Sequence, residues 1–284
     1  MVAKKRSSQR FSSTGAGKSH SARPKGSSRR GAKVAPTDTL PRGCRLVVGV
    51  HSVSEALKVR PNAVMEIWVS EERKLHAELG ALLEKVERAG QKIKEKSAHS
   101  LSQFCQTHQG IAAVVKEKPE LDWQELGVST QSEIIIALDE IVDPHNVGAI
   151  LRTAWLMGVR ALIVSELRSS PLTPTVSKVA CGGAEHLPLI SVGNLGQALS
   201  DLKTKGFWIY GLAGEEGSKN LWDEEYPAKM VWVVGSEAKG LRPSVRKQCD
   251  QIISIPQIDA DASYNASVAV ALALSESKRQ ARDF

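Results

Sequence analysis

The sequence predicts an α/β protein whose larger part is a parallel β-sheet covered by helices on both faces. From residue 133 onward, short and almost continuously apolar segments rich in Val and Ile alternate with segments of helical periodicity. Strands buried on both faces have this composition, whereas half-exposed strands alternate apolar and polar residues. A hydrophobic content of 42% is sufficient for a packed core, and a charged content of 24% is ordinary for a globular protein.

Residues 44–118 are predicted to form a smaller α/β domain. Short β-branched segments predict three strands, at residues 45–50, 64–69 and 111–115. Helical spacing follows at residues 51–59 and 75–89, and one face of the second helix is apolar through Leu75, Leu79, Leu82, Leu83 and Val86. Residues 119–131 contain Pro119, Gly127 and several polar residues, which is typical of a linker.

Residues 132–284 are predicted to form the parallel-sheet domain. The apolar segments predict strands at 134–138, 161–164, 187–190, 208–212, 230–234 and 252–255. The intervening segments predict helices at 147–157, 175–181, 195–205, 243–248 and 265–279. Ligands of such sheets lie at the carboxyl ends of the strands. The first strand runs into residues 139–144, where the glycine-rich turn of dinucleotide-binding proteins is absent, so the domain binds its ligand in another way.

The N-terminal tail, residues 1–43, is predicted to be disordered. Up to residue 42 it carries eleven Lys and Arg residues against the single Asp38, whereas the remaining 242 residues carry 27 basic and 30 acidic residues. The tail is rich in Ser and Gly and has too few apolar residues to offset the entropy of ordering. A flexible basic arm is suited to RNA or the ribosome. A tail without a partner, and a mitochondrial or plastid presequence, stay open as alternatives.

Composition also excludes several classes of protein. No apolar run approaches the roughly 20 residues that a membrane-spanning helix needs, so no membrane partner is expected. The four cysteines are widely spaced, at Cys44, Cys105, Cys181 and Cys249, and none forms a CxxC pair. This spacing argues against a disulfide scaffold and a cysteine zinc site, and favours a reducing, intracellular compartment. No metal is expected.

The first candidate motif surrounds the start of the helix predicted at 147–157. Pro144 disfavours helix at the residue before it, which makes Asn146 a candidate N-cap. The residues expected on the buried stripe are Val147, Ile150, Leu151 and Ala154. At about 100° per residue, Arg152 points away from this stripe, beside the strand ends. It is either a solvated surface arginine or a functional group.

Two further motifs follow the last two predicted strands. After the strand 230–234, Gly235 and Gly240 allow close approach to the backbone. Glu237 between them either caps the next helix or accepts a hydrogen bond from a ligand or RNA. Ser263 is a candidate N-cap for the last helix, with Asn265 beside it. Residues 266–274 are apolar on every side, which indicates a helix buried in a core or at a subunit contact.

Taken together in this order, these motifs resemble those of a known family. The segment from Asn146 to Ala154 (NVGAILRTA) resembles the first motif of the SPOUT superfamily of RNA methyltransferases. Residues 234–241 (VGSEAKGL) resemble the second motif, and 255–256 (IP) with 263–269 (SYNASVA) resemble the third. The closest branch is TrmH-like, and within it the RlmB-like ribosomal RNA 2′-O-methyltransferases, which residues 168–185 and 211–215 also resemble. The resemblance covers residues 45–280.

The resemblance implies a fold, a cofactor and an assembly. The fold is an α/β-knot, a parallel-sheet domain whose C-terminal segment passes through a loop to form a trefoil knot, preceded by an RNA-binding domain related to ribosomal protein L30. The cofactor is S-adenosylmethionine, and by motif position Gly235, Ile255 and Tyr264 line its site. Most relatives have Leu where this chain has Tyr264. Family members are homodimers whose knots form the contact.

The resemblance also assigns catalytic positions. Arg152 takes the place of the family's proposed catalytic arginine, assisted by an RNA phosphate. Because a guanidinium is normally fully protonated, orienting the ribose hydroxyl and stabilising developing alkoxide is at least as plausible as a role as literal base. Asn146, Ser263 and Asn265 would position Arg152 or the ribose, and Glu237 would shape the site.

The function expected is S-adenosylmethionine-dependent 2′-O-methylation of a guanosine in large-subunit ribosomal RNA. One alternative is the same reaction on transfer RNA. The other is a catalytically silent RNA-binding or ribosome-assembly factor, although Asn146, Arg152 and Asn265 are all present. The expected location is the cytoplasm, or a mitochondrion or plastid if the tail is a transit peptide.

Overall fold

The computed structural model describes residues 39–72, 77–117, 121–129, 131–166, 172–259 and 262–281. Most of the tail predicted to be disordered, residues 1–38, lies outside this part, and so do residues 167–171 of the family-like block at 168–185. The end of the tail is described: the backbone N–H of Cys44 donates to the carbonyl of Pro41, and Leu40 packs against the core of the first sheet. Residues 36–284 form one compact unit.

The first sheet belongs to the N-terminal part and has four strands. Its order is β1 (Cys44–Val48), β4 (Ile111–Lys116), β2 (Val64–Ser70) and β3 (Ile93–Lys96). The pairs on either side of β4 are antiparallel, and β2 pairs with β3 in parallel. Its helices are α1 (Val50–Val59), η1 (Pro61–Ala63), α2 (Ala77–Arg88) and α3 (Ala98–Phe104). The three predicted strands and both predicted helices are confirmed to within a few residues.

Besides the single turn η1, two elements of this part were not predicted. The strand β3 has the sequence IKEK and is largely exposed, so it lacks the apolar character of a buried strand. Helix α3 has one fully buried side chain, Leu101, and begins where Ser97 accepts a hydrogen bond from the backbone N–H of Ser100. Neither element has a periodic apolar face that the sequence could show, and both depend on contacts with neighbouring elements.

The second sheet has seven strands, and every pair in it is parallel, as predicted. Its order is β7 (Leu189–Val192), β6 (Ala161–Ser165), β5 (Glu133–Asp139), β10 (Lys229–Gly235), β8 (Trp208–Leu212), β11 (Gln251–Ser254) and β9 (Lys219–Asn220). Thus β10 lies between two strands that precede it in the chain. The two-residue strand β9 was not predicted because it is too short to show a pattern.

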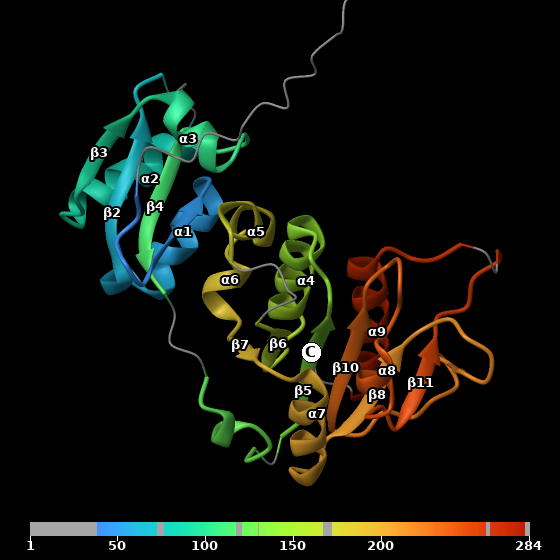
Figure 1. Cartoon of the computed structure of the whole chain (residues 1–284). Coiled ribbons are helices and arrows are strands. Elements are labelled where there is room, and N and C mark those ends of the chain that lie inside the picture. The colour runs from blue at the N-terminus through green and yellow to red at the C-terminus, as the bar shows by residue number, and fades with distance from the viewer. Residues whose placement is uncertain are drawn as a thin grey trace, which may run out of the picture. The chain divides into compact units, whose positions relative to one another are not determined.

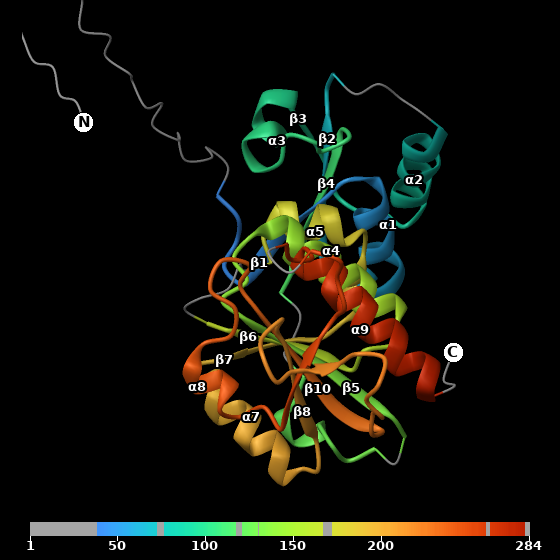
Figure 2. The ribbon, with the colours of Figure 1, turned by 90° about the vertical axis from the view of Figure 1, so that its right-hand side faces the viewer.

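Helices cover both faces of this sheet, and the two covers can be followed in Figures 1 and 2. One face carries α4 (Pro144–Leu156), α5 (Pro174–Ala180), α6 (Gly183–His186) and α9 (Ala266–Ala281). The other carries α7 (Leu195–Thr204) and α8 (Pro243–Arg246). Side chains alternate along the strands, so that Ile134, Ile136 and Leu138 face the first set and Ile135 and Ala137 face the second.

The predicted linker packs onto the second sheet. The short helix η2 (Trp123–Glu125) lies within it, and Leu126 is fully buried against the α7 face. Lys205 donates to the carbonyls of Trp123 and Leu126. The carboxylate of Glu133 accepts from backbone N–H groups of the same segment. The described part of this segment is therefore attached to the larger domain.

The prediction that Asn146 caps the helix that carries Arg152 is wrong. Helix α4 begins at Pro144, and its N-cap is Asp143, whose carboxylate accepts from the backbone N–H of His145 at 3.1 Å. Proline is well suited to the first helical position, so the helix starts three residues earlier than predicted. Asn146 is consequently inside the first turn and is free to serve another purpose. The buried stripe from Val147 to Ala154 and the exposed Arg152 are as predicted.

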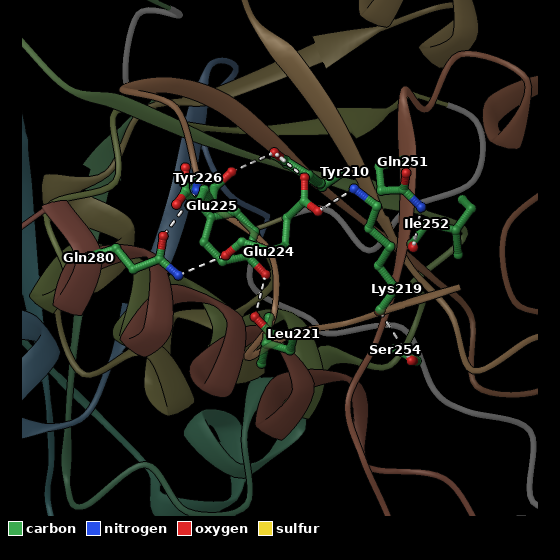
Figure 3. A network of polar contacts seen from close by, with 10 residues as sticks. All are labelled: Tyr210, Lys219, Leu221, Glu224, Glu225, Tyr226, Gln251, Ile252, Ser254 and Gln280. Carbon is green, nitrogen blue, oxygen red and sulfur yellow. Dashed lines mark hydrogen bonds and ion pairs between the residues drawn. The ribbon is translucent and has the colours of Figure 1, made fainter. Parts of the chain in front are cut away.

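A polar network stabilises the edge of the sheet near β8 (Figure 3). The buried Tyr210 donates to the carboxylate of Glu224 and to the carbonyl of Glu225, both at 3.3 Å. Glu224 also pairs with Lys219, while Gln280 of α9 donates to the carbonyl of Glu224. Burial, with the negative charge of Glu224, raises the pKa of Tyr210, which keeps its hydroxyl protonated. The network thus connects β8, β9 and α9.

Removing the Tyr210 hydroxyl tests this network. Tyr210→Phe leaves the acceptors on Glu224 and Glu225 without their donor and should lower the free energy of unfolding by about 1 kcal/mol. Tyr264→Phe is the matched control, because the exposed hydroxyl of Tyr264 makes a single bond, to the carbonyl of Pro256 at 3.3 Å. Urea unfolding of both variants without ligand would contradict the account if their midpoints shifted equally.

Candidate functional site

A cavity lies at the carboxyl ends of β8, β10 and β11. It has a volume of about 380 Å³ and is lined by Arg246 and by residues from four segments, 212–215, 234–241, 253–257 and 262–269. The first three segments leave adjacent strands of the sheet, and the fourth leads into α9. Because β10 is inserted beside β8, loops far apart in the chain meet at one edge. The volume is in the range of small-molecule sites.

The three residues predicted to line a cofactor site, Gly235, Ile255 and Tyr264, all line this cavity. A Cβ atom on Gly235 would lie only 2.3 Å from the backbone carbon and oxygen of Gly240. The loop therefore folds back directly onto the end of β10, and the backbone N–H of Gly240 donates to the carbonyl of Ser236 at 2.8 Å. Only glycine permits this approach.

A network of amides and a carboxylate lies beside the cavity. The Nδ2 group of Asn146 donates to Oε1 of Glu237 at 3.1 Å, and the Nδ2 group of Asn265 donates to the same oxygen at 2.9 Å. Asn265 also donates to Oδ1 of Asn146 at 2.8 Å. Asn146 is buried on α4, whereas the other two residues are more exposed. Three residues from the three sequence motifs therefore hold one another in place.

The same residues also fix the start of α9. The backbone N–H of Ala266 donates to Glu237 at 3.3 Å, and Oδ1 of Asn265 accepts from the backbone N–H of Ser267 at 2.9 Å. Arg242 is the N-cap of α8, the next helix along the chain, so Glu237 does not cap that helix and is instead an acceptor at the start of the last helix. Its role as an acceptor for a ligand or RNA stays a prediction. The N-cap position belongs to Asn265, so the prediction that Ser263 caps this helix is wrong. Ser263 lines the cavity instead.

Arg152 stands apart from this network. Its side chain is exposed on α4, and Nη1 donates to Sγ of Cys181 at 3.6 Å. Cys181 is held in the left-handed backbone region, with φ 48°, between α5 and α6. Of the five residues predicted to be catalytic, the structure joins Asn146, Glu237 and Asn265, lines the cavity with Ser263, and places Arg152 on the outer surface of α4.

Two ion pairs near the cavity were missed by sequence reasoning. Asp139, at the end of β5, is completely buried and accepts hydrogen bonds from the backbone N–H and the guanidinium of Arg242. This pair fastens the far end of the loop that carries Glu237. Glu215 and Arg246 pair across the cavity lining. A buried Asp at a strand end was a signal available in the sequence, whereas its partner, 103 residues away, was not.

The part of the chain that the structure describes contains no helix able to span a bilayer. Within those residues, no three His, Cys, Asp or Glu side chains come together as a group that could hold a metal ion. All four cysteines are free thiols.

A cavity at the carboxyl ends of parallel strands, with a fixed polar cluster beside it, defines an α/β enzyme that binds a small molecule at this edge. Residues 133–275 match the model of the SpoU rRNA methylase family, and residues 46–121 match the model described as RNA 2′-O ribose methyltransferase substrate binding. The chain belongs to the SpoU rRNA methylase family.

Relatives support the same assignment. The chain is 38% identical over 242 residues to the 23S rRNA (guanosine-2′-O-)-methyltransferase RlmB of Shewanella oneidensis, covering 84% of this chain and 98% of the relative. It is 36% identical to the RlmB of Neisseria meningitidis, covering 83% and 95%. The fold is similar to that of the SpoU methyltransferase AviRb from Streptomyces viridochromogenes in complex with AdoMet, with a TM-score of 0.72, 23% identity and coverage of 85% and 91%.

Replacing Asn265, the N-cap of α9, tests whether this residue serves the site in addition to stabilising the helix. Asn265→Ala removes the N-cap and the donor to Asn146 and Glu237, and should lower the free energy of unfolding by about 1 kcal/mol. Asn194→Ala is the control, because Asn194 caps α7 in the same way on the opposite face of the sheet. Only Asn265→Ala should also slow methyl transfer to RNA. Equal rates in the two variants would contradict a role for Asn265 in the site.

Proposed function

We propose that this protein transfers a methyl group from S-adenosylmethionine to the ribose 2′-hydroxyl of a guanosine in 23S-type ribosomal RNA. The observation that carries the proposal is the alignment with the RlmB enzymes, which covers 98% of the Shewanella relative. The assembled cluster of Asn146, Glu237 and Asn265 supports an active enzyme over the silent RNA-binding factor. Methylation of transfer RNA is the alternative substrate.

The cavity fits S-adenosylmethionine by the chemistry of its lining. Apolar side chains such as Leu212, Ile253 and Ile255 suit an adenine ring, while the carboxylates of Glu215 and Glu237 suit a cationic ligand. The glycine at position 235 keeps side-chain atoms away from the loop backbone. When bound, S-adenosylmethionine supplies an electrophilic methyl group whose leaving group departs neutral. We assign Gly235, Ile255 and Tyr264 to this site.

The protein residues then have to orient the hydroxyl and assist the loss of its proton. We assign Arg152 to this task. A guanidinium stays protonated, so it acts by donating hydrogen bonds to the ribose oxygen and stabilising the negative charge that develops on it. An RNA phosphate beside Arg152 is suited to assist by accepting the proton that the hydroxyl loses. Arg152 is exposed, and among the residues that the structure describes it makes only a long contact, with Cys181, so its side chain is available to RNA.

The remaining polar residues serve the reaction indirectly. Both polar ends of Asn265 are engaged within the protein, by Asn146 and Glu237 on one side and by Ser267 on the other. Asn265 and Asn146 are therefore assigned to keeping α4 and α9 in register at the cavity, with Glu237 as their shared acceptor. Ser263, which lines the cavity, is assigned to contact with the ligand or the ribose.

Domain roles and assembly complete the proposal. We assign residues 44–118, related to ribosomal protein L30, to RNA binding, 119–131 to the linker and 132–284 to catalysis in a trefoil-knotted domain. The outer face of α9 supports a homodimer: Val268 is 45% exposed in the single chain, although the sequence predicted burial on every side. A second copy would cover this face. Because the proposed substrate is a bacterial type of ribosomal RNA, we assign the protein to the cytoplasm. We assign the basic N-terminal tail as an arm that binds RNA.

The substrate is tested by transfer of tritiated methyl groups from S-adenosylmethionine to purified, unmodified ribosomal and transfer RNAs, followed by mapping of the alkali-resistant 2′-O-methyl position. Label confined to one guanosine of large-subunit RNA is the expected result. Label on transfer RNA would support the alternative substrate. The absence of label from both RNAs and from ribosomal subunits would overturn the enzymatic proposal.

Arg152→Ala should lower the rate of methyl transfer at least about 100-fold, because the developing charge loses its donor. The affinity for S-adenosylmethionine should stay within twofold of the wild type, since Arg152 does not line the cavity. Arg160→Ala is the matched control, an exposed arginine just beyond the same helix that pairs with Glu125. Single-turnover kinetics with saturating RNA measure the rate, and undiminished turnover in Arg152→Ala would rule out the assignment.

A further inference from the structure

A carboxylate of α6 joins the N-terminal part of the chain to the catalytic domain. Glu185 is 1% exposed and pairs with the guanidinium of Arg45, which is itself buried on β1. A second guanidinium, that of Arg60, lies 3.5 Å from the other carboxylate oxygen. Arg60 also donates to the carbonyls of Lys116 and Glu117, at the end of β4. Glu185 therefore holds two cations that belong to the substrate-binding region matched at residues 46–121, or lie directly before it.

Neighbouring contacts extend the same interface. The hydroxyl of Ser52 on α1 donates to the carbonyl of Ser177 on α5 at 2.8 Å. Nε2 of His186 lies 2.8 Å from the carboxylate of Glu55, and hydrogen bonding to His186 is the main cause that lowers the pKa of Glu55. Burial lowers the pKa of Arg60, which is the desolvation cost of placing its charge here. The contact is thus formed by polar and charged groups that are buried or half-buried.

The opposite side of α5 and α6 packs directly on the helix that carries Arg152. A Cβ atom on Gly183 would lie 2.8 Å from the carbonyl oxygen of Leu151 and 3.1 Å from Cα of Arg152. The turn between α5 and α6 also places Sγ of Cys181 against the guanidinium of Arg152. Backbone packing at this distance leaves no room for α6 to slide along α4. Any displacement of α6 is therefore transmitted to the surroundings of Arg152.

The buried ion pair of Glu185 and Arg45 is better suited to fix how the two surfaces meet than to raise the free energy of unfolding. Removing two charges from water carries a large desolvation cost, and a buried ion pair is often no more stable than an apolar replacement. The site is also incompletely satisfied, because the Nε atom of Arg45 is buried and has no hydrogen-bond partner among the described residues. What such a pair does supply is a directional contact that permits one arrangement of the two surfaces.

We propose that Glu185 is a positioning residue that docks the RNA-binding part of the chain onto the α5–α6 pair, and so fixes the bound ribose relative to Arg152. This inference rests on the proposed function, because it concerns delivery of the same substrate to the same residue. It predicts that RNA binding and methyl transfer can be separated. RNA is still bound when docking is lost, but its ribose is no longer held in line for transfer.

The test is Glu185→Gln in the full chain, with Glu84→Gln as the control. Glu84 pairs with Arg88 within α2, on the surface and away from the interface. With saturating RNA, Glu185→Gln should lower kcat at least fivefold, while its Kd for S-adenosylmethionine and its Kd for RNA stay within twofold of the wild type. Small-angle X-ray scattering should show a larger radius of gyration. Glu84→Gln should change none of these quantities.

A milder variant keeps the test decisive if Glu185→Gln does not fold. Arg60→Ala removes the longer of the two ion pairs and leaves Arg45 with Glu185. Arg60→Ala should also lower kcat, but by a smaller factor than Glu185→Gln. An unchanged kcat in the folded variants, or a loss of cofactor affinity as large as the loss of kcat, would overturn the inference. If the wild type itself methylates no RNA, the proposed function fails, and the scattering comparison still decides whether Glu185 docks the two parts.

Discussion

The candidate site depends on one carboxylate oxygen. Oε1 of Glu237 accepts from Asn146 on α4, from Asn265 before α9 and from the backbone at the start of α9. Asn146 and Asn265 are 119 residues apart in the chain, and each lies in a different sequence motif. An acceptor-only group with several lone pairs is suited to bring such donors together. If this oxygen is lost, Asn146 and Asn265 lose the acceptor that they share, and the direct hydrogen bond from Asn265 to Asn146 remains.

The loop that carries Glu237 is held at three points, which explains how an exposed carboxylate can be placed accurately. Gly235 and Gly240 touch through their backbones at its start, the fully buried Asp139 fastens Arg242 at its end, and the two asparagines hold its middle. A site whose residues are fixed before the substrate arrives has less reorganisation to undergo during the reaction. Glu185 is proposed to act in the same way on a larger scale, by fixing the position of the N-terminal RNA-binding part before the reaction.

Much of the fold could be predicted from the sequence, because buried parallel strands are almost continuously apolar. Six of the strands in the second sheet were recognised in this way, and β9, with two residues, was not. Helix ends were harder to predict. Asp143 and Asn146 are both good N-caps, and only the position of Pro144 in the first turn decides between them. Ser263 and Asn265 presented the same ambiguity, which is resolved by the contact of Asn265 with Glu237.

The site itself was predicted as a set of residues but not as an arrangement. The motifs located Asn146, Glu237 and Asn265, yet periodicity says nothing about contacts between loops of different strands. The separation of Arg152 from this cluster, and the ion pairs at Asp139 and Glu185, depend on long-range packing that one sequence does not show. The most direct measurement is kcat for methyl transfer by Glu237→Ala, with Glu133→Ala as the control, because the carboxylate of Glu133 accepts two backbone N–H groups at the opposite end of the sheet. A fall of at least tenfold is expected in Glu237→Ala alone, and equal kcat in the two variants would contradict the central role of Glu237.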